Sequence, residues 1–550
     1  MKGSSHRIAI VGGGPSGVSV FSELLHFLDL KVCEAPIHIT LIDKAGEFGY
    51  GTPYCTKLNG HVINMTVSTM SMKSDQVDHF YYWLLSNPDK WRQDYEIGSL
   101  APDDVVPRRL FGLYVNSMYN EARQNARSLG IEVETVTAEA TDIAEDEDGV
   151  RLRFGLNELY FDQVFLCVGN TSASAGQELQ GTPGYFHDAW PEERIMQAIP
   201  KDEPVVILGS GLTAIDVMIT LQENGHRAPI TMVSRRGLLP KVRNKAKPYN
   251  LVYISPRNIQ KKTQNGKFPL SLGDAIALLR KEFDNANEHF GPDDGYYKRK
   301  DKGHIETLRE DIARVKSGHA NYFSVLKAID NQIGLIWNAM SLQARTEFNK
   351  LYTTLWNIHC YPMPLLNGER TLKALEEGQL TVKGGFRDIS YDRTQGLFKV
   401  RTKLGMEEEI VETRFVINAT GQGMDLSTSR SRLLRSGLQS GVITAHPLGG
   451  IDVDFTTGRT RTAFGYYSDR LYVVGLLTRG VHFYTNSVVE NVRCAKRAAL
   501  DAVDRIAKRA EYSGPIALTL NERGRTATPA FQGARERGFG ENEVVVASPR

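Results

Sequence analysis

One pattern occurs twice in this chain, and the second copy begins about 200 residues after the first. Each copy runs from a short apolar strand into a glycine-rich turn, a helix and a second strand. These segments are residues 8–11, 12–17, 18–28 and 37–42 in the first copy, and residues 205–208, 209–214, 215–224 and 230–233 in the second. Strands that alternate with helices predict parallel sheets, which bind ligands at the carboxyl ends of their strands. Two such units indicate two dinucleotide sites.

Both units also close alike, with an apolar strand followed by a glycine, at residues 164–169 and 415–421. The second unit is longer because it contains a helical pattern at about 256–358. One apolar stripe within this region is expected in a core, and it comprises Leu326, Ile329, Ile333, Ile336 and Trp337. Ser271 and Asp274 fit a cap at the start of the first helix in this region.

The first glycine turn meets the needs of a dinucleotide pyrophosphate, which are close backbone approach and the unpaired N–H groups of a helix N-terminus. Gly12, Gly14 and Gly17 supply both between a strand and a helix. Asp43 ends the next strand and is placed to accept hydrogen bonds from a free ribose diol. The pattern predicts an FAD site, and the alternative is a purely structural turn.

The second glycine turn lacks an acidic residue after its second strand. Its turn residues are Gly209, Gly211 and Ala214, and the strand is followed by Ser234, Arg235 and Arg236. No carboxylate occurs between residues 235 and 247. A carboxylate would repel a ribose 2′-phosphate, whereas a guanidinium can bind it through two parallel hydrogen bonds. We therefore expect NADPH rather than NADH, and the alternative is a solvated basic loop.

These features predict an α/β fold with two Rossmann-like dinucleotide-binding units and an inserted helical subdomain. The expected FAD-binding domain comprises residues 1–198 and 422–510. The expected NADPH-binding domain comprises residues 199–421, with the insertion at about 256–358. Residues 511–550 lack periodicity, so they are expected to form a disordered tail.

Further motifs resemble a branch of the two-dinucleotide-binding flavoproteins. They are Gly51-Thr52-Pro53-Tyr54, Ile63-Asn64 with Met70-Ser71, and residues 106–114 and 234–240. That branch includes flavin-dependent N-monooxygenases of small amino acids, such as the aspartate N-monooxygenases that form nitrosuccinate. The resemblance covers about residues 6–505 and implies FAD and NADPH. It departs at residues 359–364, where this chain has His-Cys-Tyr-Pro-Met-Pro in place of a His-Arg-x-Arg-x-Pro segment.

Several cofactor-binding positions follow from the resemblance and from the last helix. Asn64 and Met65 resemble flavin-adjacent positions of the branch. Asn486 and Ser487 begin the last helix, whose N-terminus would face a reduced flavin, although these residues could equally be turn and cap residues. The closing glycines, Gly421 and Gly475, are expected among the cofactor-binding residues.

The cysteines restrict the reaction. None of the five stands at C-x-x-C spacing from another, which excludes a local dithiol as the electron acceptor of FAD. The resemblance favours molecular oxygen as the acceptor, with N-hydroxylation of a small amine or amino acid through a flavin hydroperoxide. The alternatives are a reductase that acts on an organic acceptor and a non-catalytic flavin-binding protein.

An amino-acid substrate would need a cation for its carboxylate. The candidates are Arg108, Arg109, Arg370 and Arg479, each of which could instead form a surface ion pair. No catalytic triad or metal cluster stands out, and we assign no catalytic residue because the cofactor carries the chemistry.

Composition sets the expected partners. The net charge of +2 offers no basic field for nucleic acid or an anionic membrane. No apolar run approaches the ~18 residues that a membrane helix needs, and scattered free cysteines suit a reducing compartment. We therefore expect a cytoplasmic enzyme whose partners are a small-molecule substrate and oxygen. The sequence leaves the oligomeric state open.

Overall fold

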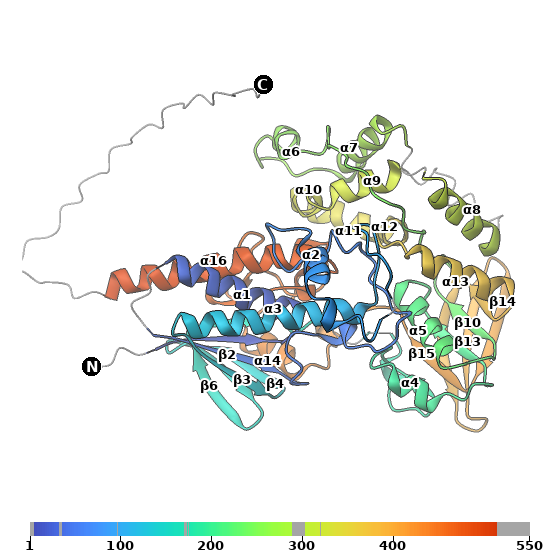
Figure 1. Cartoon of the computed structure of the whole chain (residues 1–550), viewed down its shortest axis with the longest axis horizontal. Coiled ribbons are helices and arrows are strands. Elements are labelled where there is room, and N and C mark those ends of the chain that lie inside the picture. Colours follow the sequence, from blue (N-terminus) through green and yellow to red (C-terminus); the bar gives the residue numbers. More distant parts are fainter. Residues whose placement is uncertain are drawn as a thin grey trace, which may run out of the picture.

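The computed structural model describes residues 5–31, 36–95, 97–169, 173, 175–288, 303–318 and 321–513. Two α/β units lie next to each other, and a group of helices lies above the second unit in the view of Figure 1. Within these ranges, no helix is long and apolar enough to cross a membrane.

The first unit is built on a six-stranded sheet with the order β16-β17-β7-β1-β2-β3. Its strands are β1 (His6–Val11), β2 (Ile37–Asp43), β3 (Glu132–Thr137), β7 (Gln163–Leu166), β16 (Arg459–Arg461) and β17 (Tyr467–Val473). β1 pairs in parallel with β2 and β7, and β17 pairs in parallel with β7. The carboxyl ends of these four strands therefore share one edge of the sheet.

The second unit repeats this arrangement in a parallel sheet with the order β11-β10-β9-β15-β8. Its strands are β8 (Tyr185–Phe186), β9 (Val205–Leu208), β10 (Ile230–Val233), β11 (Leu380–Lys383) and β15 (Phe415–Asn418). β9 lies between β10 and β15, as β1 lies between β2 and β7. β8 pairs with β15 although it precedes residue 199, so this sheet includes a strand from before the expected domain boundary.

Each parallel sheet is accompanied by a three-stranded antiparallel sheet, and this extends the repeat. These sheets consist of β4 (Ala140–Glu145), β5 (Val150–Phe154) and β6 (Asn157–Phe161), and of β12 (Phe386–Asp392), β13 (Leu397–Leu404) and β14 (Glu407–Thr413). In both units this sheet comes directly before the closing parallel strand. The predicted α/β fold with two Rossmann-like units is confirmed.

Helices cover the parallel sheets. In the first unit α1 (Pro15–Leu30), α3 (Arg108–Ser128) and α16 (Val488–Ser513) run side by side (Figure 1). The other helices of the two units are α2 (His79–Ser86), α4 (Glu193–Ala198), α5 (Leu212–Glu223), α13 (Leu365–Glu376), α14 (Arg432–Ser440) and α15 (Arg479–His482). α16 continues through residues 511–513, which the sequence placed in the tail, and residues 514–550 lie outside the described residues.

The helical region comprises α6 (Pro256–Lys262), α7 (Leu272–Asn285), α8 (His304–Lys316), α9 (Asn321–Ile329), α10 (Ile333–Ala339), α11 (Leu342–Leu351) and α12 (Thr353–Cys360). The predicted cap of α7 is confirmed, because the Ser271 hydroxyl accepts a hydrogen bond from the Asp274 N–H at 3.1 Å. Leu308 and Ile312 of α8 pack in the core of the second unit, whereas the other helices share a core of their own.

The apolar stripe predicted for this region is buried in that separate core. The expectation of one continuous helical stripe was wrong, because its residues lie on two helices. α9 ends at Ile329 and α10 begins at Ile333. Asp330 follows α9 directly, where the chain leaves the helical path.

The insertion also fixes the segment that leads into α16. The Trp337 indole N–H donates to the Gly480 carbonyl at 2.9 Å, and its ring stacks on Phe483 at a centroid distance of 4.4 Å. Phe483 has a φ of +59°, a conformation that costs a bulky residue about 1–3 kcal/mol. Packing against the insertion offsets this strain and holds residues 479–484 in one conformation.

Candidate functional site

The first glycine turn lies at the carboxyl edge of the first sheet. Gly12 has a φ of +112°, and a Cβ there would lie 2.2 Å from the Cys167 carbonyl oxygen. A Cβ on Gly17 would lie 1.9 Å from the Gly12 carbonyl oxygen. The fold itself therefore requires these two glycines, because α1 and β7 approach the turn too closely for side chains.

Gly14 differs from its two neighbours in this turn. It precedes α1 with a φ of −78°, which any residue adopts. A Cβ there would approach only Gly51, whose Cα and N would lie at ordinary contact distances of 3.4 and 3.9 Å. The surrounding protein does not explain the absence of a side chain, whereas a phosphate bound at the helix N-terminus would.

Asp43 lies beside this turn, as predicted for a ribose-binding carboxylate. One of its oxygens accepts a hydrogen bond from the Gly13 N–H at 2.8 Å, and the other accepts from the Ala45 N–H at 2.8 Å. These bonds fix the carboxylate against the turn. The second oxygen also accepts from the Gly46 N–H at 3.2 Å, so the oxygen bound to Gly13 is the one with a lone pair left for a ligand hydroxyl.

The C-terminal part of the chain completes this edge. Gly475 follows β17 with a φ of +104°, and a Cβ there would lie 3.0 Å from the Ser16 hydroxyl at the start of α1. Ser487 accepts a hydrogen bond from the Glu490 N–H at 3.4 Å, which caps α16. Asn486 is exposed, and Asn64 is half-buried.

In the second glycine turn, as in the first, one glycine is required by the fold and another is not. Gly209 has a φ of +118°, and its Cβ would lie 2.5 Å from the Ala419 carbonyl oxygen. Ala214 is fully buried in the core. Gly211 has open space around its Cβ position and a φ of −87°. Gly421 has a φ of +96°, so its backbone conformation alone favours glycine.

The arginine pair of the second unit lies next to this turn. The Ser210 hydroxyl in the turn donates to the Ser234 hydroxyl at 2.9 Å, and Ser234 accepts from the Gly237 N–H at 2.9 Å. Ser234 therefore ties the loop of Arg235 and Arg236 to the glycine turn. Both arginine side chains are exposed, where a ligand can reach them.

Basic residues further along this loop have other surroundings. Lys241 forms an ion pair with Asp311 of α8 at 3.0 Å. The Arg243 guanidinium lies over the Phe323 ring at 4.8 Å. The loop is therefore not a uniform phosphate-binding surface.

Two of the four arginines proposed for a substrate carboxylate bind carboxylates of the protein itself. Arg108 of α3 forms two bonds to Asp216 of α5, at 2.7 and 3.1 Å, and this pair joins the two units. Arg370 of α13 pairs with Glu223 at 3.1 Å. Neither arginine is therefore kept among the candidate substrate ligands.

The other two arginines have no such pairing among the described residues. The Arg109 guanidinium lies over the Tyr50 ring at 4.4 Å. Arg479 begins α15 and is half-buried. Its positive charge acts on Tyr361, which stacks on Tyr484. Arg479 therefore lies near the tyrosine pair of Tyr361 and Tyr484, and Tyr484 lines a small pocket.

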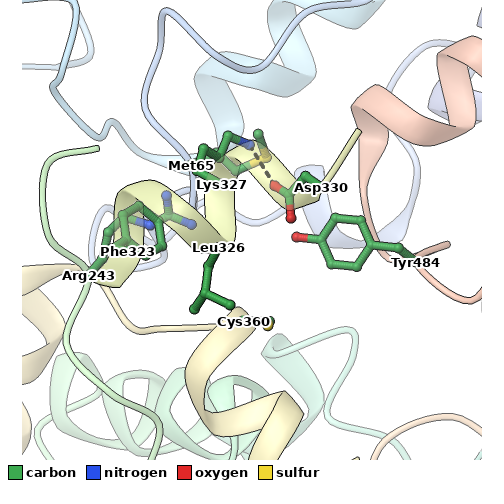
Figure 2. Close-up of a pocket in the computed structure, with 8 residues that line it drawn as sticks. All are labelled: Met65, Arg243, Phe323, Leu326, Lys327, Asp330, Cys360 and Tyr484. Carbon is green, nitrogen blue, oxygen red and sulfur yellow. Dashed lines mark hydrogen bonds and ion pairs between the residues drawn. The ribbon is translucent and has the colours of Figure 1, made fainter. Parts of the chain in front are cut away.

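This pocket lies where the two units and the insertion meet (Figure 2). The first unit contributes Met65 and Tyr484, and the loop after β10 contributes Arg243. The insertion contributes Phe323, Leu326, Lys327, Asp330 and Cys360. Met65, predicted to be flavin-adjacent, therefore forms one wall of a pocket that also contains charged side chains.

The charges in the pocket have shifted pKa values. Burial lowers the pKa of Arg243 to about 10, so this guanidinium remains protonated at neutral pH. Burial raises the pKa of Asp330, while the charge of Lys327 opposes that shift. Burial raises the pKa of Tyr484 well above its usual value, so the phenol remains neutral.

Sequence reasoning missed most of this pocket. In the sequence, Arg243 is one of several basic residues in the loop after Arg236, and no motif includes Lys327, Asp330 or Tyr484. One signal was present, because Asp330 interrupts an apolar stripe. The side chains that surround it come from segments far apart in the chain.

The described cysteines offer no redox pair. Cys55, Cys167, Cys360 and Cys494 are free thiols. Burial raises the pKa of Cys55 and of Cys494 to about 12, and it raises those of Cys167 and Cys360 as well. These thiols stay protonated at neutral pH, which suits packing rather than thiolate chemistry.

Comparisons with known proteins agree with this geometry. Residues 9–171 match the FAD-NAD(P)-binding family. YdhS of Escherichia coli, an uncharacterized protein, is 25% identical in an alignment 258 positions long, which covers 42% of this chain and 46% of YdhS. Nitrosuccinic acid synthase npaA of Aspergillus oryzae is 22% identical in an alignment 626 positions long, gaps included, which covers 94% of this chain and 95% of that protein.

Solved structures with the same fold include two amino-acid monooxygenases. L-lysine 6-monooxygenase from Pseudomonas syringae has a TM-score of 0.52 at 15% identity, covering 92% of this chain and 100% of that chain. Ornithine N-hydroxylase from Kutzneria sp. 744, with reduced FAD, NADP+ and L-ornithine, has a TM-score of 0.50 at 12% identity and the same coverage. Residues 9–171 therefore match the FAD-NAD(P)-binding family, and the chain shares its fold with these two solved structures.

Proposed function

We propose that this protein is an NADPH-dependent FAD monooxygenase that N-hydroxylates a small amine or amino acid. FAD would bind at the first glycine turn, through Gly14 and Asp43. NADPH would bind at the second turn, with its pyrophosphate at Gly211 and its 2′-phosphate on Arg235 and Arg236. One observation carries the cofactor assignment: Gly14 and Gly211 each precede a helix, and neither has a reason within the protein to be glycine.

The overall reaction would convert an amine, oxygen, NADPH and a proton into a hydroxylamine, NADP+ and water. Bound FAD would supply the redox chemistry, accepting hydride and passing the electrons to oxygen. The chain would hold both cofactors and restrict the access of water to the site where they meet. The insertion, which packs against residues 479–484 beside the pocket, is placed to provide that enclosure.

Two further observations support this reaction. The free, protonated thiols of the described residues are unsuited to disulfide reduction. The fold is shared with ornithine and lysine monooxygenases, and a relative along nearly the whole chain is a nitrosuccinic acid synthase. Nitrosuccinic acid is the nitro counterpart of aspartic acid, so aspartate is the first amine to test.

Removing both guanidinium groups, with Arg235→Ala and Arg236→Ala together, should weaken the binding of NADPH selectively. The loss should be about 1–3 kcal/mol, the scale of lost charged hydrogen bonds, while NADH binding changes little. The rate of flavin reduction, followed by absorbance against the concentration of each coenzyme, measures both. Equal losses for the two coenzymes would place the 2′-phosphate contact elsewhere.

The reaction itself is tested by aerobic turnover of the FAD-loaded protein with L-aspartate and a panel of small amines and amino acids. With the true substrate, NADPH and oxygen consumption should match the yield of hydroxylamine-, oxime- or nitro-level product, with little peroxide. Peroxide as the main product across the whole panel would contradict N-oxygenation.

A further inference from the structure

The pocket in Figure 2 contains opposite charges in a partly enclosed site. Arg243 lies on one side, stacked on Phe323. Asp330 lies on the other side, at the end of α9. The pocket adjoins Met65, so it lies next to the position proposed for the flavin. It is therefore placed where a molecule oxidised by that flavin would bind.

The Arg243 guanidinium forms no ion pair in the part of the chain that the structure describes, although its charge and that of Asp330 stabilise each other across the pocket. Its Nε is buried and makes no hydrogen bond. The backbone holds the residue in place, because the Arg243 N–H donates to the Met363 carbonyl at 2.7 Å. A fixed guanidinium whose Nε donor is buried and unused is costly unless a ligand satisfies it, and a carboxylate matches its geometry.

Three cations of the protein act on Asp330, because the charges of Lys327, Arg243 and Arg493 all lower its pKa. Lys327 donates to its Oδ2 at 3.0 Å, and Oδ1 has no hydrogen bond from the described residues. Its side chain is 21% exposed. The Tyr484 hydroxyl is directed toward this carboxylate in Figure 2. The Asp330 side of the pocket can therefore accept hydrogen bonds from an amine or ammonium group.

We infer that this pocket, whose free volume of about 10 Å³ is that of one water molecule in the present structure, opens to bind the substrate as a small amino acid, with the carboxylate on Arg243 and the amino group facing Asp330. This inference rests on the proposed function for the identity of the ligand as the substrate. The binding itself needs neither NADPH nor oxygen. Arg243 and Asp330 are substrate-positioning residues in this arrangement, and a substrate without a carboxylate would leave Arg243 unpaired.

The test is calorimetric titration of the FAD-loaded protein, without NADPH, with L-aspartate, L-alanine, β-alanine and ethylamine. At least one of the three amino acids should bind, and ethylamine, which lacks a carboxylate, should bind far more weakly. Arg243→Gln should lower the affinity for that amino acid about 10- to 100-fold, the loss expected for charged hydrogen bonds. Arg243→Lys, which keeps the charge, should restore part of the affinity. Asp330→Asn should also weaken binding.

Arg345→Gln is the matched control. Arg345 also stacks on an aromatic ring, Trp337 at 5.8 Å, and also has a buried Nε without a hydrogen bond, but it does not line the pocket. The Arg345→Gln variant should bind the amino acid with unchanged affinity. Circular dichroism and FAD content should match the wild type for each variant.

Three results would overturn the inference: no binding by any of the four compounds, ethylamine binding as tightly as the amino acids, or an Arg243→Gln protein with unchanged affinity. Failure of the proposed function would look different. In that case amino acids would bind in an Arg243-dependent manner, but aerobic turnover would give no N-oxygenated product.

Discussion

A Gly14→Val protein should fold but purify without the yellow colour of bound FAD. The existing protein leaves room at the Gly14 Cβ position, where the nearest atom lies 3.4 Å away. The added side chain would instead occupy the space in which a pyrophosphate approaches the start of α1. The cost to folding should be about 1 kcal/mol, the scale of replacing a good helix N-cap, against a typical stability of about 5–15 kcal/mol. Flavin absorbance per mole of purified protein measures the loss.

Two other glycines serve as controls. Gly211→Val makes the same change in the second turn, so that protein should keep FAD and lose reduction by NADPH. Gly17→Val should instead fail to fold, because a Cβ there would lie 1.9 Å from a backbone oxygen. A folded Gly14→Val protein with full FAD occupancy would show that the first glycine turn is not the FAD site.

Arg108→Ala should cause the largest loss of stability among the arginine substitutions. It would leave Asp216, whose side chain is only 6% exposed, without its partner across the two units. Removing one member of a buried ion pair costs about 3–5 kcal/mol. Denaturant unfolding of the variant against the wild type measures this loss. The Arg108→Ala, Asp216→Ala double variant should lose less than the sum of the single variants.

Arg370→Ala is the control for this experiment. Its ion pair with Glu223 is more exposed, with side-chain exposures of 37% and 27%, so its loss should cost about 0–1 kcal/mol. If Arg108→Ala cost no more than Arg370→Ala, the Arg108–Asp216 pair would not be holding the two units together.

Local patterns allowed the two glycine turns to be predicted, because strand, turn, helix and strand follow one another within a few tens of residues. The roles of the arginines could not be predicted in the same way. Arg108 meets Asp216 from a helix 108 residues away, and nothing near Arg108 in the sequence identifies that partner. The pocket is likewise assembled from three parts of the chain. Asp330 directly follows α9, and its N–H still donates to the Leu326 carbonyl, so it lies on the same side of the chain as Leu326.

Glycine spacing also could not show why each glycine is present. Gly12 and Gly17 are required by backbone contacts within the fold, whereas Gly14 and Gly211 are not. The four glycines lie in similar sequence patterns. Their different roles become visible only in the structure, where the positions of the neighbouring strands are known. The structure thereby points to the two positions where substitution should affect a ligand rather than the fold.

Anaerobic mixing of the FAD-loaded protein with excess NADPH and its amine substrate tests the central claim most directly. A monooxygenase should oxidise about one equivalent of NADPH per FAD and then stop, because oxygen is the acceptor of the electrons. Admitting oxygen should restart NADPH oxidation and yield the N-oxygenated product. Sustained oxidation of NADPH over many turnovers without oxygen would contradict the monooxygenase and identify a reductase that uses an organic acceptor.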